Sequence, residues 1–115
     1  MKIIIIDDDP DFCRLLQLLL EKDGHDVHCE YTLIGGLTVI DNIKPEVIFI
    51  DNFLPDGEGW LQAGQIQKKY PEARINLISA ADKSFLRTNN FSQSIWEKPI
   101  TKEQLDNYFM YLGTG

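Results

Sequence analysis

The chain has 115 residues, of which 43% are hydrophobic and 25% are charged, a balance typical of one globular domain rather than of a disordered segment. Its formal net charge of −7 disfavours non-specific binding to nucleic acid, because the phosphate backbone carries the same sign. The first apolar run has only four residues and no stretch approaches the roughly 20 apolar residues of a membrane span, so we expect neither a signal peptide nor a membrane helix.

Short apolar runs alternate with helical patterns along the chain, which predicts a parallel sheet with helices on both faces. The four consecutive isoleucines at 3–6 predict a strand that is buried on both faces. A helix should follow over 10–22, because Asp9 suits its N-cap and a proline suits its first turn. The alternating residues 25–30 fit an edge strand.

The middle of the chain repeats the same order of elements. Leucine and isoleucine at helical spacing predict a helix over 33–43, and the apolar run 47–50 predicts a second buried strand that Asp51 closes. A third helix should span 60–70, where Pro71 stops it. Between strand and helix, the composition of residues 54–57 indicates a turn.

Two more strands and a final helix are expected in the last third of the chain. The strands should lie at 75–78 and 94–97. The final helix should span 101–112, where Thr101 and a glutamine three residues later form a capping box. The segment 81–93 has sparse apolar positions and poor helix formers, so we expect a short or irregular fourth helix there.

Three carboxylates, Asp7, Asp8 and Asp9, follow the first strand directly. Clustered carboxylates repel: two unit charges about 5 Å apart cost on the order of 3 kcal/mol at an effective dielectric of about 20. A cap for the first helix explains Asp9, and it is also the structural alternative for the other two acids. Two further carboxylates at a strand end favour a site for a hard cation such as Mg²⁺.

Other strands end in polar residues that should reach the same edge of the sheet. Asp51 closes the second buried strand, Ser79 follows the next one, and Lys98 follows the last. Ligands of open α/β sheets bind outside the carboxyl ends of the strands. Taken singly, these residues have structural explanations as a loop acid, a helix cap and a surface lysine, whereas their convergence predicts a functional site.

Four motifs resemble the receiver domain of two-component response regulators, over residues 1 to about 112. The motifs are Ile6-Asp7-Asp8-Asp9-Pro10, Asp51-Asn52-Phe53-Leu54-Pro55-Asp56-Gly57, Ile78-Ser79-Ala80 and Lys98-Pro99. The resemblance implies a doubly wound, five-stranded parallel sheet of flavodoxin-like order 2-1-3-4-5 with five helices. The receiver domain would span 1–112, and 113–115 would be a frayed C-terminal end or a boundary.

The resemblance also assigns roles to individual residues. It implies that Asp51 is the phosphoacceptor, that Ser79 is the switch hydroxyl and that Lys98 binds the phosphoryl group. The implied ligands of Mg²⁺ are Asp7, Asp8, Asp51 and the backbone carbonyl of Phe53. Receivers usually have a cis peptide before the proline that follows this lysine.

One position departs from the family pattern. Receivers commonly carry Tyr or Phe three residues before the lysine, and this aromatic side chain moves with the switch hydroxyl. Here that position is Ile95, and the aromatic residue is Trp96, which strand alternation places on the opposite face. A receiver-like interaction module with lost or altered switching is therefore the alternative to a working phosphorylation switch.

The leading function is a Mg²⁺-dependent phosphoacceptor that assists its own phosphoryl transfer and dephosphorylation but is not an enzyme in the ordinary sense. The implied partners are a histidine kinase or phosphotransfer protein and a downstream effector domain or protein. We expect no direct nucleic acid contact, and a homodimer stays open. Cys13 and Cys29 have no metal-binding spacing and suit reduced thiols in the cytoplasm.

Overall fold

The computed structural model describes residues 1–80 and 93–114. One sheet contains five strands, in the order β2-β1-β3-β6-β7, and all of its neighbouring strands are parallel. The strands are β1 (Lys2–Ile6), β2 (Asp26–Glu30), β3 (Val47–Asp51), β6 (Arg74–Ser79) and β7 (Ser94–Glu97). Counted along the chain within this sheet, the order is 2-1-3-4-5, so the predicted doubly wound topology is confirmed.

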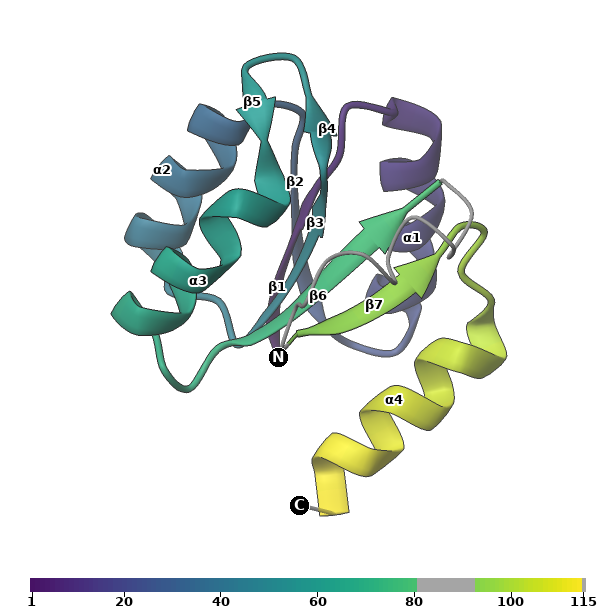
Figure 1. Cartoon of the computed structure of the whole chain (residues 1–115). Coiled ribbons are helices and arrows are strands. Elements are labelled where there is room, and N and C mark those ends of the chain that lie inside the picture. The colour runs from purple at the N-terminus through teal and green to yellow at the C-terminus, as the bar shows by residue number, and fades with distance from the viewer. Residues whose placement is uncertain (81–92, 115) are drawn as a thin grey trace.

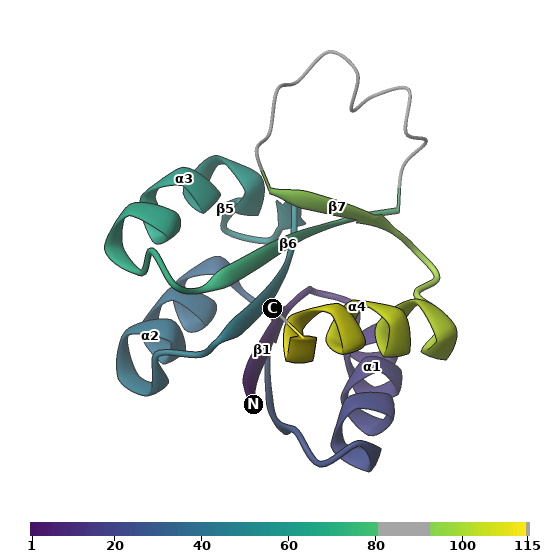
Figure 2. The ribbon, with the colours of Figure 1, turned by 90° about the horizontal axis from the view of Figure 1, so that it is seen from below.

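The helices form one layer on each face of the sheet. They are α1 (Pro10–Lys22), α2 (Leu33–Ile43), α3 (Gly59–Lys69) and α4 (Lys102–Thr114). Figures 1 and 2 show α2 and α3 on one face and α1 and α4 on the other. The expected fourth of five helices falls on 81–92, outside the described residues. None of the helices in the described part of the chain has the length and apolarity that crossing a membrane requires.

The isoleucines of β1 connect the two layers. Ile4 and Ile6 pack on the side of α2 and α3, whereas Ile3 and Ile5 pack on the side of α1 and α4. All four side chains are fully buried. Burying a side chain of this size contributes roughly 1.5–3 kcal/mol. The run that predicted a doubly buried strand therefore forms the centre of both cores and holds the carboxyl end of β1 in place.

Two predicted helix caps are present in the structure. The Asp9 carboxylate accepts hydrogen bonds from the backbone N–H groups of Asp11 and Phe12 at 3.0 and 3.3 Å. At the start of α4, Thr101 N–H donates to Gln104 Oε1 at 2.9 Å and Gln104 N–H donates to Thr101 Oγ1 at 3.1 Å. The first bonds explain why Asp9, unlike the two acids before it, serves the helix.

A small hairpin separates β3 from α3. Its strands β4 (Phe53–Leu54) and β5 (Gly57–Glu58) pair antiparallel, with Phe53 opposite Glu58 and Leu54 opposite Gly57. The predicted turn is therefore the tip of a hairpin that stands at the carboxyl edge of the sheet (Figure 1). The hairpin therefore stands beside the carboxyl ends of the strands, where the sequence predicts the functional site (Figure 1).

Candidate functional site

Three carboxylates meet at the carboxyl ends of β1 and β3. These strands are neighbours in the sheet, and Ile6 lies opposite Ile50. Asp7 and Asp51, the residues directly after this pair, therefore lie side by side. One oxygen each from Asp7, Asp8 and Asp51 lies within 4.8 Å of the other two. Asp7 is fully buried, Asp51 is 7% exposed and Asp8 is exposed. The predicted cluster is therefore formed, and most of it lies away from solvent.

Lys98 supplies a positive charge to this cluster. Its Nζ lies 2.6 Å from Oδ2 of the buried Asp7, and its side chain is 17% exposed. The same ammonium lies 4.4 Å from the centroid of the Phe12 ring, a distance that suits a cation–π contact. The Lys98–Pro99 peptide is cis, as the resemblance implies. Among the described residues, this one ammonium stands beside three carboxylates, so two formal negative charges of the cluster have no ion-pair partner there.

The donor set suits a hard divalent cation. Asp7 Oδ1 accepts a hydrogen bond from Asp9 N–H at 2.9 Å, and Asp51 Oδ1 accepts one from Asn52 N–H at 2.9 Å. Asp7 Oδ2 is buried and, among the described residues, has the Lys98 ion pair but no directed hydrogen bond. Carboxylate oxygens with unused acceptor capacity are the ligands that Mg²⁺ and Ca²⁺ prefer.

The environment of the cluster disfavours the charged form of Asp51. Burial, followed by the nearby Asp7 charge, raises the pKa of Asp51 from 3.8 to about 6, and the Lys98 ammonium opposes this rise. Ionisation of Asp51 is therefore costly in this environment unless another positive charge is close. A bound cation would favour the ionised carboxylate.

A pocket of about 480 Å³ opens over the cluster. Its lining consists of Asp8, Asp9, Asp51, Asn52, Phe53, Trp60, Ile78, Ser79, Ala80 and Lys98. Asp51 and Ser79 are only 7% and 6% exposed, so the pocket is their route to solvent. The carboxyl ends of β3, β6 and β7 thus bring the predicted acid, hydroxyl and ammonium to one cavity.

The buried side chain of Asn52 fixes the loop that carries Asp51. Its Oδ1 accepts a hydrogen bond from Trp60 N–H at 3.3 Å, and its carbonyl oxygen accepts one from Gly59 N–H at 2.8 Å. These bonds satisfy the start of α3, where Glu58 makes no side-chain cap. A Cβ atom on Gly59 would lie 2.2 Å from the Asp51 carbonyl oxygen, so this contact requires glycine.

The comparison with protein families is decisive. The family model for the response regulator receiver domain matches residues 3–109. The chain belongs to the response regulator receiver domain family. Receiver domains are signalling domains that interact with histidine kinases and effector domains.

Solved structures agree with this assignment. A two-component response regulator from Clostridium difficile is 28% identical, with a TM-score of 0.83 over 97% of this chain and 94% of that one. A CheY-like receiver domain protein from Methanospirillum hungatei JF-1 is 24% identical, with a TM-score of 0.83 over 96% of this chain and 91% of that one. A response regulator protein from Burkholderia pseudomallei, solved with a phosphorylated aspartic acid, a calcium ion and citrate, is 21% identical, with a TM-score of 0.78 over 90% of this chain and 63% of that one.

In this receiver domain, the residues predicted from sequence lie together at one edge of the sheet. The cavity is lined by Asp8, Asp51, Ser79 and Lys98. Asp7 does not line it but contacts Lys98 and belongs to the same acidic cluster. Lys98 pairs with Asp7 rather than with Asp51, which leaves the Asp51 carboxylate at the wall of the pocket. Phe53 also lines the pocket, and its side chain is 60% exposed.

Two residues of the segment 52–58, between Asp51 and α3, have roles that sequence reasoning missed. Asn52 caps α3, although the sequence shows it only as the neighbour of an acid. Asp56 accepts hydrogen bonds from Leu33 N–H at 2.7 Å and Ile34 N–H at 2.9 Å, at the start of α2. Asp56 is more than twenty positions away from these donors, so no local pattern could have indicated this contact.

The aromatic residue of β7 faces α4. Trp96 packs with the core on the side of α1 and α4, whereas Ile95 packs with the opposite core, as strand alternation predicts. Trp96 Nε1 donates to Asn76 Oδ1 at 3.0 Å, and Asn76 Nδ2 donates to the Tyr108 hydroxyl oxygen at 3.0 Å. The buried Asn76 therefore links β7 to α4 on the face that Ile95 does not reach.

Proposed function

We propose that this receiver domain accepts a phosphoryl group on Asp51, in a Mg²⁺-dependent reaction in the cytoplasm. The observation that carries the proposal is the position of Asp51. Its carboxylate is almost buried, lies in the wall of a pocket and adjoins both an acidic cluster and a lysine. The phosphorylated aspartic acid in the Burkholderia pseudomallei response regulator supports the same chemistry on this fold.

The metal ligands in this proposal are Asp7, Asp8, Asp51 and the backbone carbonyl of Phe53. When bound there, Mg²⁺ supplies charge neutralisation for the phosphoryl oxygens and helps to align the donor. The calcium ion in the Burkholderia pseudomallei structure is a hard cation of the same class. Among the described residues, the net negative charge of the cluster supports this assignment, as does the buried Asp7 Oδ2, which has an ion pair but no directed hydrogen bond.

The proposed reaction uses Asp51 as the nucleophile. A carboxylate oxygen of Asp51 forms a bond to phosphorus while the bond from phosphorus to the donor histidine nitrogen breaks, and the histidine then takes a proton from solvent. Lys98 would face the developing charge on the phosphoryl oxygens from the edge of the pocket. The Ser79 hydroxyl would donate to one of these oxygens, which draws its loop towards the site.

The proposed partners are a histidine kinase or phosphotransfer protein as donor and an effector domain or protein as target. Phosphorylation would change the surface that the effector binds. A receiver-like interaction module with altered switching is the second candidate. It is favoured by Ile95, which replaces the usual aromatic residue, and by the attachment of Trp96 to Asn76 on the other face.

Phosphoryl uptake from a small donor tests this function. The full chain is incubated with acetyl phosphate and Mg²⁺, and its intact mass is measured. We expect one added phosphoryl group in the wild type and in Asp106→Asn, a matched change of an exposed acid on α4. Asp51→Asn, or a chelator in place of Mg²⁺, should prevent it. Failure of the wild type to react would favour the interaction module, and uptake by Asp51→Asn would place the acceptor elsewhere.

A further inference from the structure

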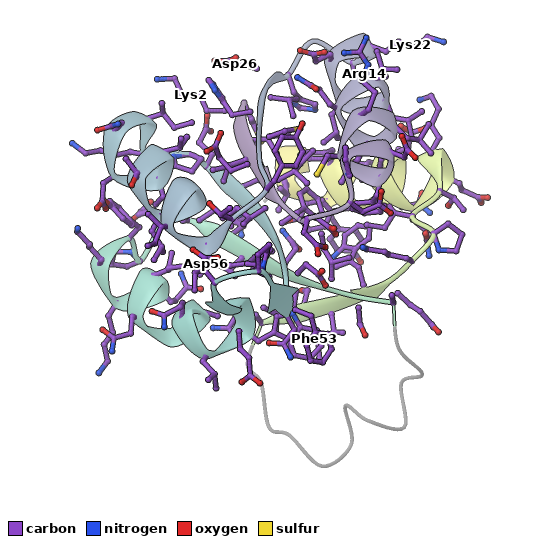
Figure 3. All side chains as sticks on the ribbon, turned by 90° about the horizontal axis from the view of Figure 1, so that it is seen from above. Lys2, Arg14, Lys22, Asp26, Phe53 and Asp56 are labelled. Atoms are coloured by element: carbon purple, nitrogen blue, oxygen red, sulfur yellow. The ribbon has the colours of Figure 1, made fainter. Side chains whose placement is uncertain are left out.

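Asp56 connects the hairpin of β4 and β5 to α2. Its two carboxylate oxygens accept separate hydrogen bonds, from Leu33 N–H at 2.7 Å and from Ile34 N–H at 2.9 Å. These bonds lower the pKa of Asp56. Figure 3 shows Asp56 on the side of the hairpin next to α2 and Phe53 on the other side. Both donors belong to the first turn of α2, where backbone N–H groups have no partner within the helix and attract negative charge.

The hairpin is too short to hold its position by its own strand pairing. It contains two residue pairs, and an isolated hairpin of this kind is marginally stable. Leu54 is buried, whereas the Phe53 side chain is 60% exposed and anchors its own backbone weakly. Asn52 attaches the base of the hairpin to α3, and Asp56 attaches the tip to α2. The backbone of Phe53 lies between these two attachments.

We propose that Asp56 is a positioning residue for the acceptor site: by fastening the hairpin to α2, it holds the Phe53 carbonyl where a metal ion can bind. This inference rests on the proposed function, in which that carbonyl is a metal ligand. Residues that orient metal ligands typically change metal affinity by 10- to 100-fold when they are mutated. The competing explanation is that Asp56 only stabilises α2.

Thr32 provides a matched control for that explanation. Its Oγ1 accepts a hydrogen bond from Gly35 N–H at 3.0 Å, so it also caps the first turn of α2. This bond lies at the start of α2 itself, whereas the bonds of Asp56 cross from the hairpin. Removal of either cap should weaken α2, but only removal of Asp56 should release the hairpin.

The test compares Mg²⁺ affinity with thermal stability in the full chain. Mg²⁺ titrations are followed by the change in tryptophan fluorescence, because Trp60 lines the pocket, and melting temperatures are measured without Mg²⁺. We expect Asp56→Ala and Thr32→Ala to lower the melting temperature similarly, while only Asp56→Ala weakens Mg²⁺ binding, by about tenfold. Asp56→Asn keeps one acceptor oxygen and should give an intermediate affinity. It carries the test alone if Asp56→Ala does not fold.

Two results would overturn the positioning role. One is a wild-type Mg²⁺ affinity in the Asp56 variants, and the other is an equal loss of affinity in Thr32→Ala. Both leave the proposed function intact, provided that the wild type binds Mg²⁺ and Asp8→Asn does not. If the wild type itself shows no Mg²⁺ binding, the metal site and this inference fail together.

Discussion

At the scale of single residues, burial decides how the carboxylates of the site differ. Asp7 is fully buried and paired with Lys98, whereas Asp8 is exposed at the mouth of the same cluster. Asp51 lies between these extremes, beside a pocket and close to the charge of Asp7. Asp51, the proposed phosphoacceptor, is therefore also a carboxylate whose ionisation opposes folding.

Replacing Asp51 should stabilise the folded protein near neutral pH. The pKa of Asp51 is raised to about 6, so the folded state binds its proton more tightly than the unfolded chain does. The resulting penalty is complete above the folded-state pKa and disappears as the pH falls below the ordinary pKa of 3.8. In urea unfolding without Mg²⁺, Asp51→Asn should therefore raise the free energy of unfolding by about 1–3 kcal/mol at about pH 7.5.

The same comparison at low pH supplies the control. At about pH 3.5 Asp51 is largely protonated in both states, so most of the advantage of Asp51→Asn should be gone. An equal advantage at both pH values would show that packing, and not ionisation, causes the difference. A less stable Asp51→Asn at about pH 7.5 would contradict the electrostatic description of the site.

The sequence indicates which carboxylates meet at the edge of the sheet, but not how deeply each one is buried. Asp7 and Asp8 follow the apolar run of β1, and Asp51 closes that of β3. Parallel topology alone brings such residues to one edge. Nothing local distinguishes the buried Asp7 from the exposed Asp8. The contact of Asp56 with Leu33 depends on the packing of two segments that are distant in sequence, so the sequence shows only a turn at that position.

At the scale of elements, the junction between β3 and α3 is the most constrained. Gly59 begins α3 directly against the backbone of Asp51, and a Cβ atom there would lie 2.2 Å from the Asp51 carbonyl oxygen. Gly64 lies in the same helix, but a Cβ atom there would meet nothing within 4 Å. The two glycines therefore serve as a matched pair.

Alanine at these two positions should have opposite effects. Gly59→Ala should lower the free energy of unfolding by about 1–3 kcal/mol, because the backbone of Asp51 has little freedom to move aside. Gly64→Ala should raise it by about 0.5–1 kcal/mol, because alanine favours the helix. Urea unfolding of both variants measures the difference. Equal stabilities would show that α3 can shift without disturbing β3.

The regular elements are predicted well because their signals are local. The bounds of α1 and α2 match those expected from apolar spacing and caps, and α4 continues two residues beyond its expected end at 112. The hairpin after β3 was not predicted, since strands of two residues have no periodic pattern. The expectation of a short or irregular helix over 81–93 concerns a segment that lies almost entirely outside the described residues.

At the scale of the whole molecule, the site joins four parallel strands. The ends of β1 and β3 supply the acids, β6 supplies Ser79, and Lys98 follows β7. On the face towards α1 and α4, Asn76 links Trp96 to Tyr108 through hydrogen bonds. The site therefore forms only when these strands pair in one sheet, so its charge affects the stability of the entire domain.

Mg²⁺ should therefore stabilise the whole domain. A ligand that binds only the folded state raises the free energy of unfolding by about 2.7 kcal/mol at a hundredfold excess over its Kd. We expect the melting temperature of the wild type to rise with millimolar Mg²⁺, and Asp8→Asn to lose most of this rise. Potassium chloride at matched ionic strength controls for screening. A wild-type melting temperature that does not change with Mg²⁺, or an equal rise in Asp8→Asn, would contradict the metal site.

The most direct test of the central claim is to locate the phosphoryl group chemically. After reaction with acetyl phosphate and Mg²⁺, borohydride reduces an aspartyl phosphate to homoserine, which tandem mass spectrometry assigns to a position in the chain. We predict homoserine at position 51 of the wild type, and none when acetyl phosphate is omitted. Homoserine at another aspartate, such as Asp8 or Asp56, or a phosphorylated protein that yields no homoserine, would contradict the assignment of Asp51 as the phosphoacceptor.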